Sequence, residues 1–455
     1  MKKRKMKRIG MILMSLAIVL TMCIGTMSIA FAAGDPISAT GETSLTAALT
    51  KVLRMGESTT TPNASFTFTF AQQDGVTQDS TGATIETVAT TDANVPISSV
   101  TVSTDSSKTG TSDTANRIKT VEIQSSDFLA SANYTRAGIY VYKVTETGNT
   151  YAIADATKES MTYSKAEYTL YVYVANKADG SGVYIKSLGT VLTKDDAGKA
   201  AGETGASSTV GNKVDPTPNP TPTTDGSVNA NNSDMKFTND YVKTQGGGGT
   251  PTDPANQSLE IGKTVTGDYG DHTKYFDFAV TLKRPAMATN TVYKGYVVDA
   301  NNAVVTSADN LATADAAKLK SDANGNYIEF TLGTDGTITQ NVKLKHGQRL
   351  VFSDVSVGTH FQAVETAVTN YTPTLAVKVN NATVTPTSTT DSGENIVGEN
   401  KSNSAAFTNA FVDVTPTGII MNNLPFFILI IVAIGALAAY VIIKGKKRSN
   451  SAAKH

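Results

Sequence analysis

Short stretches in which apolar and polar residues alternate recur along most of this chain, and they constrain its fold more than any other feature. Alternation with a period of two places apolar side chains on one face of a strand. Gly, Asn and Asp residues separate the stretches, as they do in turns between strands, and this pattern predicts β-sandwiches. The region is too long for one ordinary sandwich, so we expect two. The expected strands are Ser65–Phe70, Gly138–Glu146, Glu167–Ala175, Val183–Val191, Leu259–Val265, Phe276–Leu282, Thr291–Val298, Tyr327–Leu332, Ile338–Leu344, Phe361–Ala367 and Thr374–Val379.

The first 32 residues have the composition of a secretory signal peptide. A basic leader precedes an apolar run that ends in Ala30-Phe31-Ala32, an A-x-A cleavage site. An uncleaved membrane anchor is the alternative. Cys23, the only cysteine, lies inside this segment, so the mature chain from Ala33 onward has no cysteine. An exported protein of this composition cannot form disulfides, and any covalent staple must use other chemistry.

The other end of the chain has the composition of a membrane span. Leu424–Ile443 contains no charged residue and is about 20 residues long, which is enough to cross a bilayer as a helix. We expect a transmembrane helix over 419–443. The tail at 444–455 is basic, which favours the cytoplasmic side of the membrane.

Between the two ends, the exported body is acidic. It holds 28 of the 39 basic residues and all 40 acidic residues, which gives a net charge of −12. Such a surface is a poor partner for nucleic acid. We expect a first domain over 33–243, with a Pro/Thr-rich loop inserted at 215–234, and a second domain over 258–413. The Gly-rich stretch 244–257 is expected to be a flexible linker between them.

One short pattern occurs twice, near the end of each expected domain. KFTNDYV occupies 236–242 and AFTNAFV occupies 406–412. In a strand, the aromatic residues of each copy face the core, and Asn239 and Asn409 then face it too. A buried amide without a partner is costly, so something must satisfy or consume it.

Each asparagine is preceded by a lysine and a glutamate in the same order. Lys51 and Lys263 lie on apolar, strand-like segments near the start of each domain. Glu146 and Glu365 end aromatic strands midway through each domain, GIYVYKVTET and GTHFQAVETA. Taken alone, either set could be an ordinary buried polar cluster, because buried charges are usually paired.

The repeated pattern resembles the isopeptide-forming, immunoglobulin-like (CnaB-like) domains of Gram-positive pilins and wall-anchored adhesins. It is most similar to two-domain major pilins of streptococcal type, and the stretch LKHGQRLVFSDVSVGTHFQAVE is similar to the family's run into its catalytic glutamate. The resemblance implies that a first-strand lysine is joined to a last-strand asparagine while the glutamate assists. The residues so assigned are Lys51, Glu146 and Asn239 in the first domain and Lys263, Glu365 and Asn409 in the second.

These residue types suit that chemistry. A lysine amine must be neutral to attack an amide carbon, and burial lowers its pKa. A carboxylic acid kept protonated by burial can polarise the asparagine carbonyl and carry the proton that leaves with ammonia. Folding holds the groups together, as in an intramolecular reaction. The reaction occurs once per domain, so the protein is not expected to be a turnover enzyme.

A second motif lies directly before the apolar span. Val414-Thr415-Pro416-Thr417-Gly418, the span and the basic tail resemble the tripartite sorting signal read by sortases. The resemblance implies cleavage after Thr417 and transfer of its acyl group to an amine. A plain membrane anchor that happens to contain Pro-Thr-Gly is the alternative. Lys213 and Lys236, just before the last strand of the first domain, are candidate acceptors for polymerisation by analogy of position.

Together, these features favour a structural subunit of a cell-surface pilus, attached covalently to the fibre or the cell wall. The expected partners are a sortase, neighbouring pilin subunits, peptidoglycan and host-surface ligands. The alternative is a monomeric wall-anchored adhesin or accessory pilin whose first domain binds a host ligand. The histidines show no metal-site spacing, so no metal or cofactor is expected.

Overall fold

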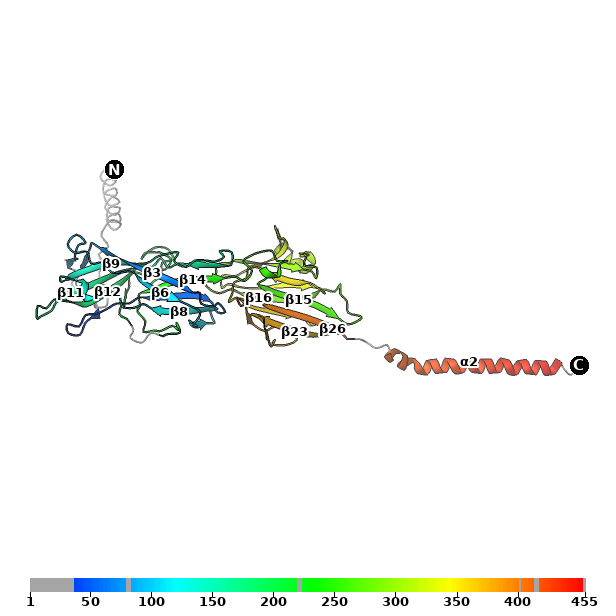
Figure 1. The fold of residues 1–455 in the computed structure, drawn as a ribbon. Helices are drawn as coiled ribbons and strands as arrows, with labels where there is room; N and C mark the ends of the chain where they lie inside the picture. Colours follow the sequence, from blue (N-terminus) through cyan, green and yellow to red (C-terminus); the bar gives the residue numbers. More distant parts are fainter. Residues whose placement is uncertain (1–36, 79–82, 219–222, 401, 413–416, 453–455) are drawn as a thin grey trace, which may run out of the picture.

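The computed structural model of the chain describes residues 37–78, 83–218, 223–400, 402–412 and 417–452. Two β-domains follow one another and lead to one long helix, α2 (Thr417–Ala452) (Figure 1). The prediction of an all-β protein with two tandem sandwiches and a C-terminal apolar helix is confirmed. In the described part of the chain, Pro425–Lys444 is the one helical segment long and apolar enough to cross a membrane. The expected signal peptide, 1–32, lies outside the described residues.

The first domain packs a seven-stranded sheet against a five-stranded sheet. The larger sheet has the order β1-β12-β11-β9-β3-β6, and β13 also pairs with β12. Its strands are β1 (Ile37–Ser38), β3 (Ala64–Gln73), β6 (Val100–Thr104), β9 (Gly138–Glu146), β11 (Glu167–Asn176), β12 (Val183–Lys194) and β13 (Lys213–Val214). The smaller sheet has the order β10-β14-β2-β8-β7. Its strands are β2 (Thr50–Gly56), β7 (Thr111–Asp113), β8 (Ile118–Gln124), β10 (Glu159–Thr162) and β14 (Lys236–Lys243), and a separate hairpin joins β4 (Val76–Gln78) to β5 (Thr84–Glu86).

The second domain also consists of two sheets. The eight-stranded sheet has the order β18-β19-β17-β21-β15-β26-β23-β24. Its strands are β15 (Leu259–Thr266), β17 (Val292–Val298), β18 (Leu319–Asp322), β19 (Gly325–Thr331), β21 (Arg349–Phe352), β23 (Tyr371–Val379), β24 (Ala382–Val384) and β26 (Ser404–Phe411). The four-stranded sheet has the order β20-β16-β22-β25. It is built from β16 (Phe276–Lys283), β20 (Thr337–Leu344), β22 (His360–Glu365) and β25 (Asn395–Ile396).

In each domain, an early strand pairs in parallel with the last strand. In the first domain β2 pairs with β14, and Leu53 lies opposite Asn239. In the second domain β15 pairs with β26, and Val265 lies opposite Asn409. Leu53 and Val265 each lie two residues after the lysine of their domain. Each lysine therefore lies on the same face of the sheet as the asparagine of the paired strand, one pleat away.

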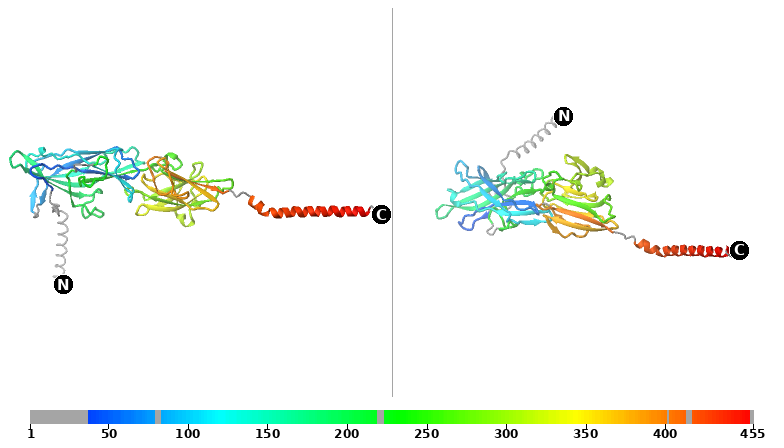
Figure 2. Two further views of the ribbon diagram at one scale, coloured as in Figure 1. Left: turned by 90° about the horizontal axis from the view of Figure 1, so that it is seen from below. Right: turned by 45° about the vertical axis from the view of Figure 1, so that its right-hand side comes forward.

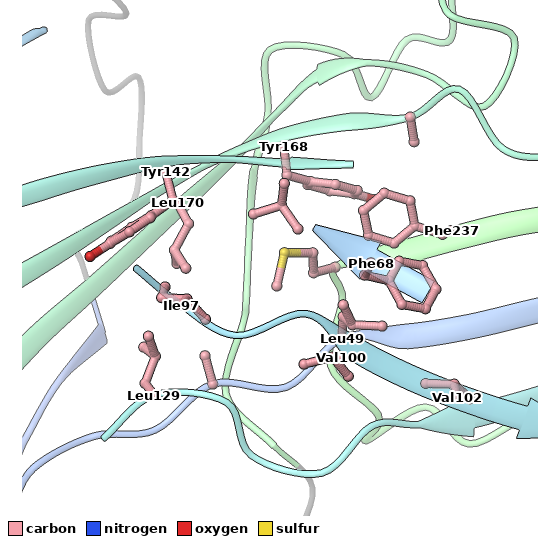
Figure 3. Packing of buried hydrophobic residues seen from close by; sticks show 14 of the residues in the cluster. Leu49, Phe68, Ile97, Val100, Val102, Leu129, Tyr142, Tyr168, Leu170 and Phe237 are labelled. Carbon is pink, nitrogen blue, oxygen red and sulfur yellow. The ribbon is translucent and has the colours of Figure 1, made fainter. Parts of the chain in front are cut away.

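Aromatic residues from facing sheets fill the core beside these strands. Figure 3 shows Phe237 of β14 next to Phe68 and Tyr168 of the opposite sheet, with ring centroids 5.0 and 5.1 Å apart. Phe278 and Phe407 make the equivalent contact in the second domain at 5.1 Å. The predicted inward-facing pattern of the two FTN strands therefore agrees with the observed packing.

The Gly-rich stretch between the domains differs from the expected flexible linker. The backbone N–H of Gly246 donates to Ser258 Oγ at 3.2 Å, and that of Gly248 donates to Ser353 O at 2.7 Å. A Cβ at Gly246 would lie 1.9 Å from Asn256 O, so glycine permits this close backbone approach. The stretch is held against the second domain because its backbone hydrogen-bonds there.

A 3-10 helix, η4 (Thr313–Lys318), precedes β18. A two-residue turn at Ala323 and Asn324 joins β18 to β19, where Asp322 pairs with Gly325. Figure 2 gives two further views of the two domains, which lie end to end.

Candidate functional site

The first domain brings Lys51, Glu146 and Asn239 into contact inside the sandwich. Lys51 comes from β2, Asn239 from β14, and Glu146 from the end of β9 in the facing sheet. The Lys51 amine donates to the two Glu146 carboxylate oxygens at 3.0 and 2.9 Å. Asn239 Nδ2 donates to Glu146 Oε1 at 2.8 Å. The glutamate thus lies between the other two residues.

The second domain repeats this arrangement with its own residues. Lys263 comes from β15, Asn409 from β26 and Glu365 from the end of β22. The Lys263 amine donates to Glu365 Oε1 at 2.6 Å, and Asn409 Nδ2 donates to the same oxygen at 2.8 Å. Both the amine and the amide therefore converge on one carboxylate oxygen.

Both clusters are shielded from water. The side chains of Lys51 and Glu146 are 0% exposed, and those of Lys263 and Glu365 are 0% and 1% exposed. Such complete burial of charged side chains is rare and costly unless they are paired.

Burial also shifts the protonation of these groups toward their neutral forms. It lowers the pKa of Lys51 to about 8 and also lowers the pKa of Lys263. It raises the pKa of Glu146 and of Glu365 because a buried carboxylate loses its hydration. Within each pair, the glutamate partly offsets the lowering of the lysine pKa, and the lysine partly offsets the raising of the glutamate pKa. The pKa of the lysine and the pKa of the glutamate therefore move toward each other. This brings the ion pair closer in energy to a neutral amine beside a neutral acid.

The asparagine carbonyls have different surroundings in the two domains. Asn239 Oδ1 accepts a hydrogen bond from the backbone N–H of Ser164 at 2.7 Å. Asn409 Oδ1 and Glu365 Oε2 are buried without a hydrogen-bond partner among the described residues. The first site therefore holds a donor where negative charge would develop on the carbonyl oxygen during attack.

Sequence reasoning missed the aromatic residues that enclose the amines. Lys51 Nζ lies 4.6 Å from the centroid of Phe66, and Lys263 Nζ lies 4.2 Å from that of Phe276. Each ring belongs to a Phe-x-Phe pair whose second member, Phe68 or Phe278, packs at an angle against the phenylalanine of the FTN strand. The repeated Phe-x-Phe in SFTFTF and YFDFAV was the available signal.

The two candidate acceptor lysines lie outside these clusters. The Lys236 amine is 3.0 Å from Glu122 Oε1, and its side chain is 34% exposed while that of Glu122 is 6% exposed. Asn232 Nδ2 also donates to this carboxylate, at 3.4 Å. Lys213 opens β13 and pairs with Val191 of β12. Lys236 is thus a partly solvated amine beside a buried carboxylate.

The loop inserted before β14 creates the setting of Lys236. Its residue Gly226 accepts a hydrogen bond from the backbone N–H of Glu122 at 2.8 Å, and Ser233 Oγ donates to Ala48 O at 2.7 Å. The loop therefore lies over β8 and covers Glu122. In the sorting motif, Val414, Thr415 and Pro416 lie outside the described residues, and Thr417 and Gly418 begin α2.

Comparison with known proteins finds similarity at two levels. A family described as a domain of unknown function (DUF7601) matches residues 257–411, which include Lys263, Glu365 and Asn409. No curated protein matches the chain.

Among solved structures, the chain is similar to the major pilin of Streptococcus pyogenes at 19% identity and a TM-score of 0.28, covering 82% of this chain and 99% of that one. The S. pyogenes major pilin T3.2 is similar at 17% identity and a TM-score of 0.26, with 82% and 99% covered. The pilus-presented adhesin Spy0125 (Cpa) is similar at 11% identity and a TM-score of 0.23, with 80% and 99% covered.

Proposed function

We propose that the chain is a structural subunit of a Gram-positive surface pilus, polymerised and wall-anchored by a sortase and strengthened by two internal Lys–Asn isopeptide bonds. One observation carries the proposal: two buried Lys–Glu–Asn clusters lie at the same register on paired strands of two successive domains. A single buried cluster is compatible with an ordinary ion pair, but two matched clusters favour a shared chemistry. The VTPTG motif before an apolar helix adds the means of attachment.

Each bond forms by attack of the lysine amine on the side-chain amide carbon of asparagine. A proton first moves within the buried pair, from the lysine ammonium to the glutamate, which leaves a neutral amine and a neutral acid. The amine nitrogen then bonds to the amide carbon, and in the first domain the backbone N–H of Ser164 hydrogen-bonds the carbonyl oxygen. The C–N bond to the amide nitrogen breaks, and that nitrogen leaves as ammonia after taking a proton through the glutamate. The proton first taken from the lysine ammonium leaves with that ammonia as an ammonium ion, so the glutamate ends as the carboxylate it began as, and the neutral mass of each domain falls by one ammonia.

Each bond would join an early strand of its domain to the last strand. In a fibre, force leaves each domain through that last strand, β14 or β26. With Lys51 bonded to Asn239, and Lys263 bonded to Asn409, the segments between the paired strands carry no tension. A covalent path then runs through both domains without any disulfide.

The intermolecular bond is proposed to form on Lys236. In this reaction the lysine amine attacks the thioester between Thr417 of another subunit and the sortase cysteine, so that a C–N bond forms and the C–S bond breaks. The ammonium must lose a proton first, and the buried Glu122 carboxylate 3.0 Å away can accept it. Of the two protons that the ammonium loses, one finally goes to the released cysteine thiolate and the other to water. Lys236 is partly exposed and can meet a second protein, whereas Lys51 and Lys263 cannot.

Fibre formation in the native host tests this proposal. Wall extracts should contain SDS-resistant ladders, and deletion of Thr415–Gly418 should abolish them. Digestion of wild-type fibres should release a branched peptide joining Thr417 to Lys236, and Lys236→Arg should remove that peptide. Lys143→Arg is the matched control, since Lys143 is also on the first domain but pairs with Glu167 at the surface.

The alternative outcomes separate the parts of the proposal. A ladder that persists in Lys236→Arg, with the branch on another lysine, would overturn the acceptor and leave the pilus function standing. Thr417 found only on wall peptide, with no ladder, would replace the backbone subunit with a monomeric wall-anchored adhesin.

A further inference from the structure

The two domains meet through close backbone contact at the ends of β2 and β14. The backbone N–H of Val357, in the second domain, donates to Lys243 O at the end of β14 at 2.8 Å. A Cβ at Gly56, the last residue of β2, would lie 2.1 Å from Val357 O, and a Cβ at Gly358 would lie 2.6 Å from Gly56 Cα. The strands that carry Lys51 and Asn239 therefore end directly against the second domain.

A histidine bridges the two domains beside this contact. His360, at the start of β22, is 7% exposed. Its Nε2 lies 2.6 Å from Glu57 Oε2 of the first domain, and its Nδ1 lies 2.6 Å from Glu394 Oε1 of the second. Lys283, which lies opposite His360 in the neighbouring strand, pairs with the same Glu394.

Two further contacts flank the histidine. Glu399 of the second domain accepts from the backbone N–H of Thr60 at 2.6 Å and pairs with Lys243 at 3.3 Å. These are first-domain residues near the ends of the same strands. Six titratable groups thus approach one seam, Glu57 and Lys243 from the first domain and Lys283, His360, Glu394 and Glu399 from the second, and the seam is complementary in charge.

Another part of the junction involves backbone acceptors. Arg117 of the first domain donates to Arg284 O at 2.6 Å and to Asp335 O at 3.0 Å. The backbone N–H of Ala286 donates to Asn116 O at 3.0 Å. These contacts limit rocking of one domain on the other, but they contain no buried ion that bridges the domains.

We propose that Glu57, His360 and Glu394 form an inter-domain latch that makes the two domains one rigid unit. A neutral imidazole has one N–H, so only a doubly protonated ring can donate to both carboxylates. Removing His360 leaves the Glu57 carboxylate, whose side chain is 6% exposed, without its counter-charge, whereas Glu394 is 43% exposed and keeps Lys283. The latch therefore fixes the relative orientation of the domains more strongly than the peripheral hydrogen bonds do.

The latch also connects the two candidate cross-link sites. Glu57 follows Lys51 by six residues, and His360 precedes Glu365 by five residues on β22. The path from one buried cluster to the other thus runs along β2, across the histidine and along β22. This inference does not depend on pilus assembly, because it concerns the isolated molecule.

Substitution of the latch in the exported body tests it. His360→Gln leaves a side-chain amide with a single NH2 group, which cannot reach both Glu57 and Glu394 as the two ring nitrogens do. Glu57→Gln removes the negative charge that the first domain contributes. Residual dipolar couplings should fit one alignment tensor for both domains in the wild type and two tensors in either variant. His272→Gln is the control, because His272 is exposed and stacks on His346, away from the junction. It should retain the single tensor.

Two results would overturn the latch. One is a single, unchanged tensor in His360→Gln and in Glu57→Gln, with both domains folded. The other needs no variant: residual dipolar couplings of the wild type that require two alignment tensors would contradict one rigid unit. The second measurement decides the matter if the variants fail to fold.

Discussion

At the scale of single residues, burial separates reactive from unreactive combinations of the same side chains. Lys, Glu and Asn meet three times in the described chain: at Lys51, at Lys263 and at Lys236, which contacts Glu122 beside Asn232. The first two amines are fully enclosed, whereas the Lys236 side chain is 34% exposed. Water stabilises an exposed ammonium ion. We therefore expect internal bonds at the first two places only.

The Lys51 amine provides a pH-dependent test of its own bond. Asn239→Ala leaves a free amine, whose pKa is lowered by burial from 10.5 to about 8. Between these values the unfolded state binds more protons than the folded state, so the free energy of unfolding should rise with pH. The rise is at most about 3 kcal/mol. In the wild type the nitrogen is an amide that does not titrate, so denaturation at pH 8 to 10.5 should show no such rise. Equal pH dependence in both proteins would contradict the bond.

The glutamate of the second domain is tested by its removal. Glu365→Ala should leave that domain folded but unlinked, because it removes the acid while Lys263 and Asn409 remain. Closing a loop longer than about 100 residues contributes about 5 kcal/mol in the chain-entropy estimate, so the melting temperature and trypsin resistance should fall markedly. Glu329→Ala, on β19, is the control and should still lose ammonia. Continued loss of ammonia in Glu365→Ala would show that the glutamate has been misassigned.

The sequence was sufficient to place all six cluster residues on strands, because Lys, Glu and Asn stand out in apolar stretches. It could not locate the Ser164 backbone donor, since a backbone N–H has no residue signature. Nor could it pair His360 with Glu57, which is distant in the chain and meets it only after both domains fold. Contacts of that kind depend on tertiary packing.

At the scale of elements, the parallel pairing of early and last strands gives the cross-links their effect. The strands β2 and β14 pair from Lys236 opposite Thr50 to Tyr241 opposite Met55. Alternation predicted eleven of the described strands to within a few residues, and it missed β8 and most of the short strands. Composition predicted a flexible linker at the Gly-rich stretch, whereas its backbone N–H groups hydrogen-bond to Ser258 and Ser353.

Cleavage between the paired strands tests this arrangement. A protease site introduced into the inserted loop, between Thr217 and Thr223, should be cut without separating the fragments that contain β2 and β14. They should migrate together after boiling in SDS, because Lys51 and Asn239 are joined. The same cut in Asn239→Ala should release two fragments. If the two fragments separate in the protein that keeps Asn239, the strands are held together by hydrogen bonds alone.

At the scale of the whole molecule, the domains and their junction form a continuous stiff body. The close approach of Gly56 to Val357 predicts that Gly56→Ala forces the domains apart, because its Cβ would lie 2.1 Å from a carbonyl oxygen. Small-angle scattering should show a larger maximum dimension or a broader distance distribution. Gly148→Ala is the control, since its Cβ would meet nothing within 4 Å. Unchanged scattering from Gly56→Ala would mean that the domains do not meet as described.

The central claim is that each domain cross-links itself, and an intact-mass measurement on the recombinant body from Ala33 to Thr417 tests it most directly. The measured mass should be lower than the sequence mass by two molecules of ammonia, one for each Lys–Asn bond. A mass lower by one molecule of ammonia would mean that only one of the two bonds forms. A mass equal to that of the sequence would contradict both.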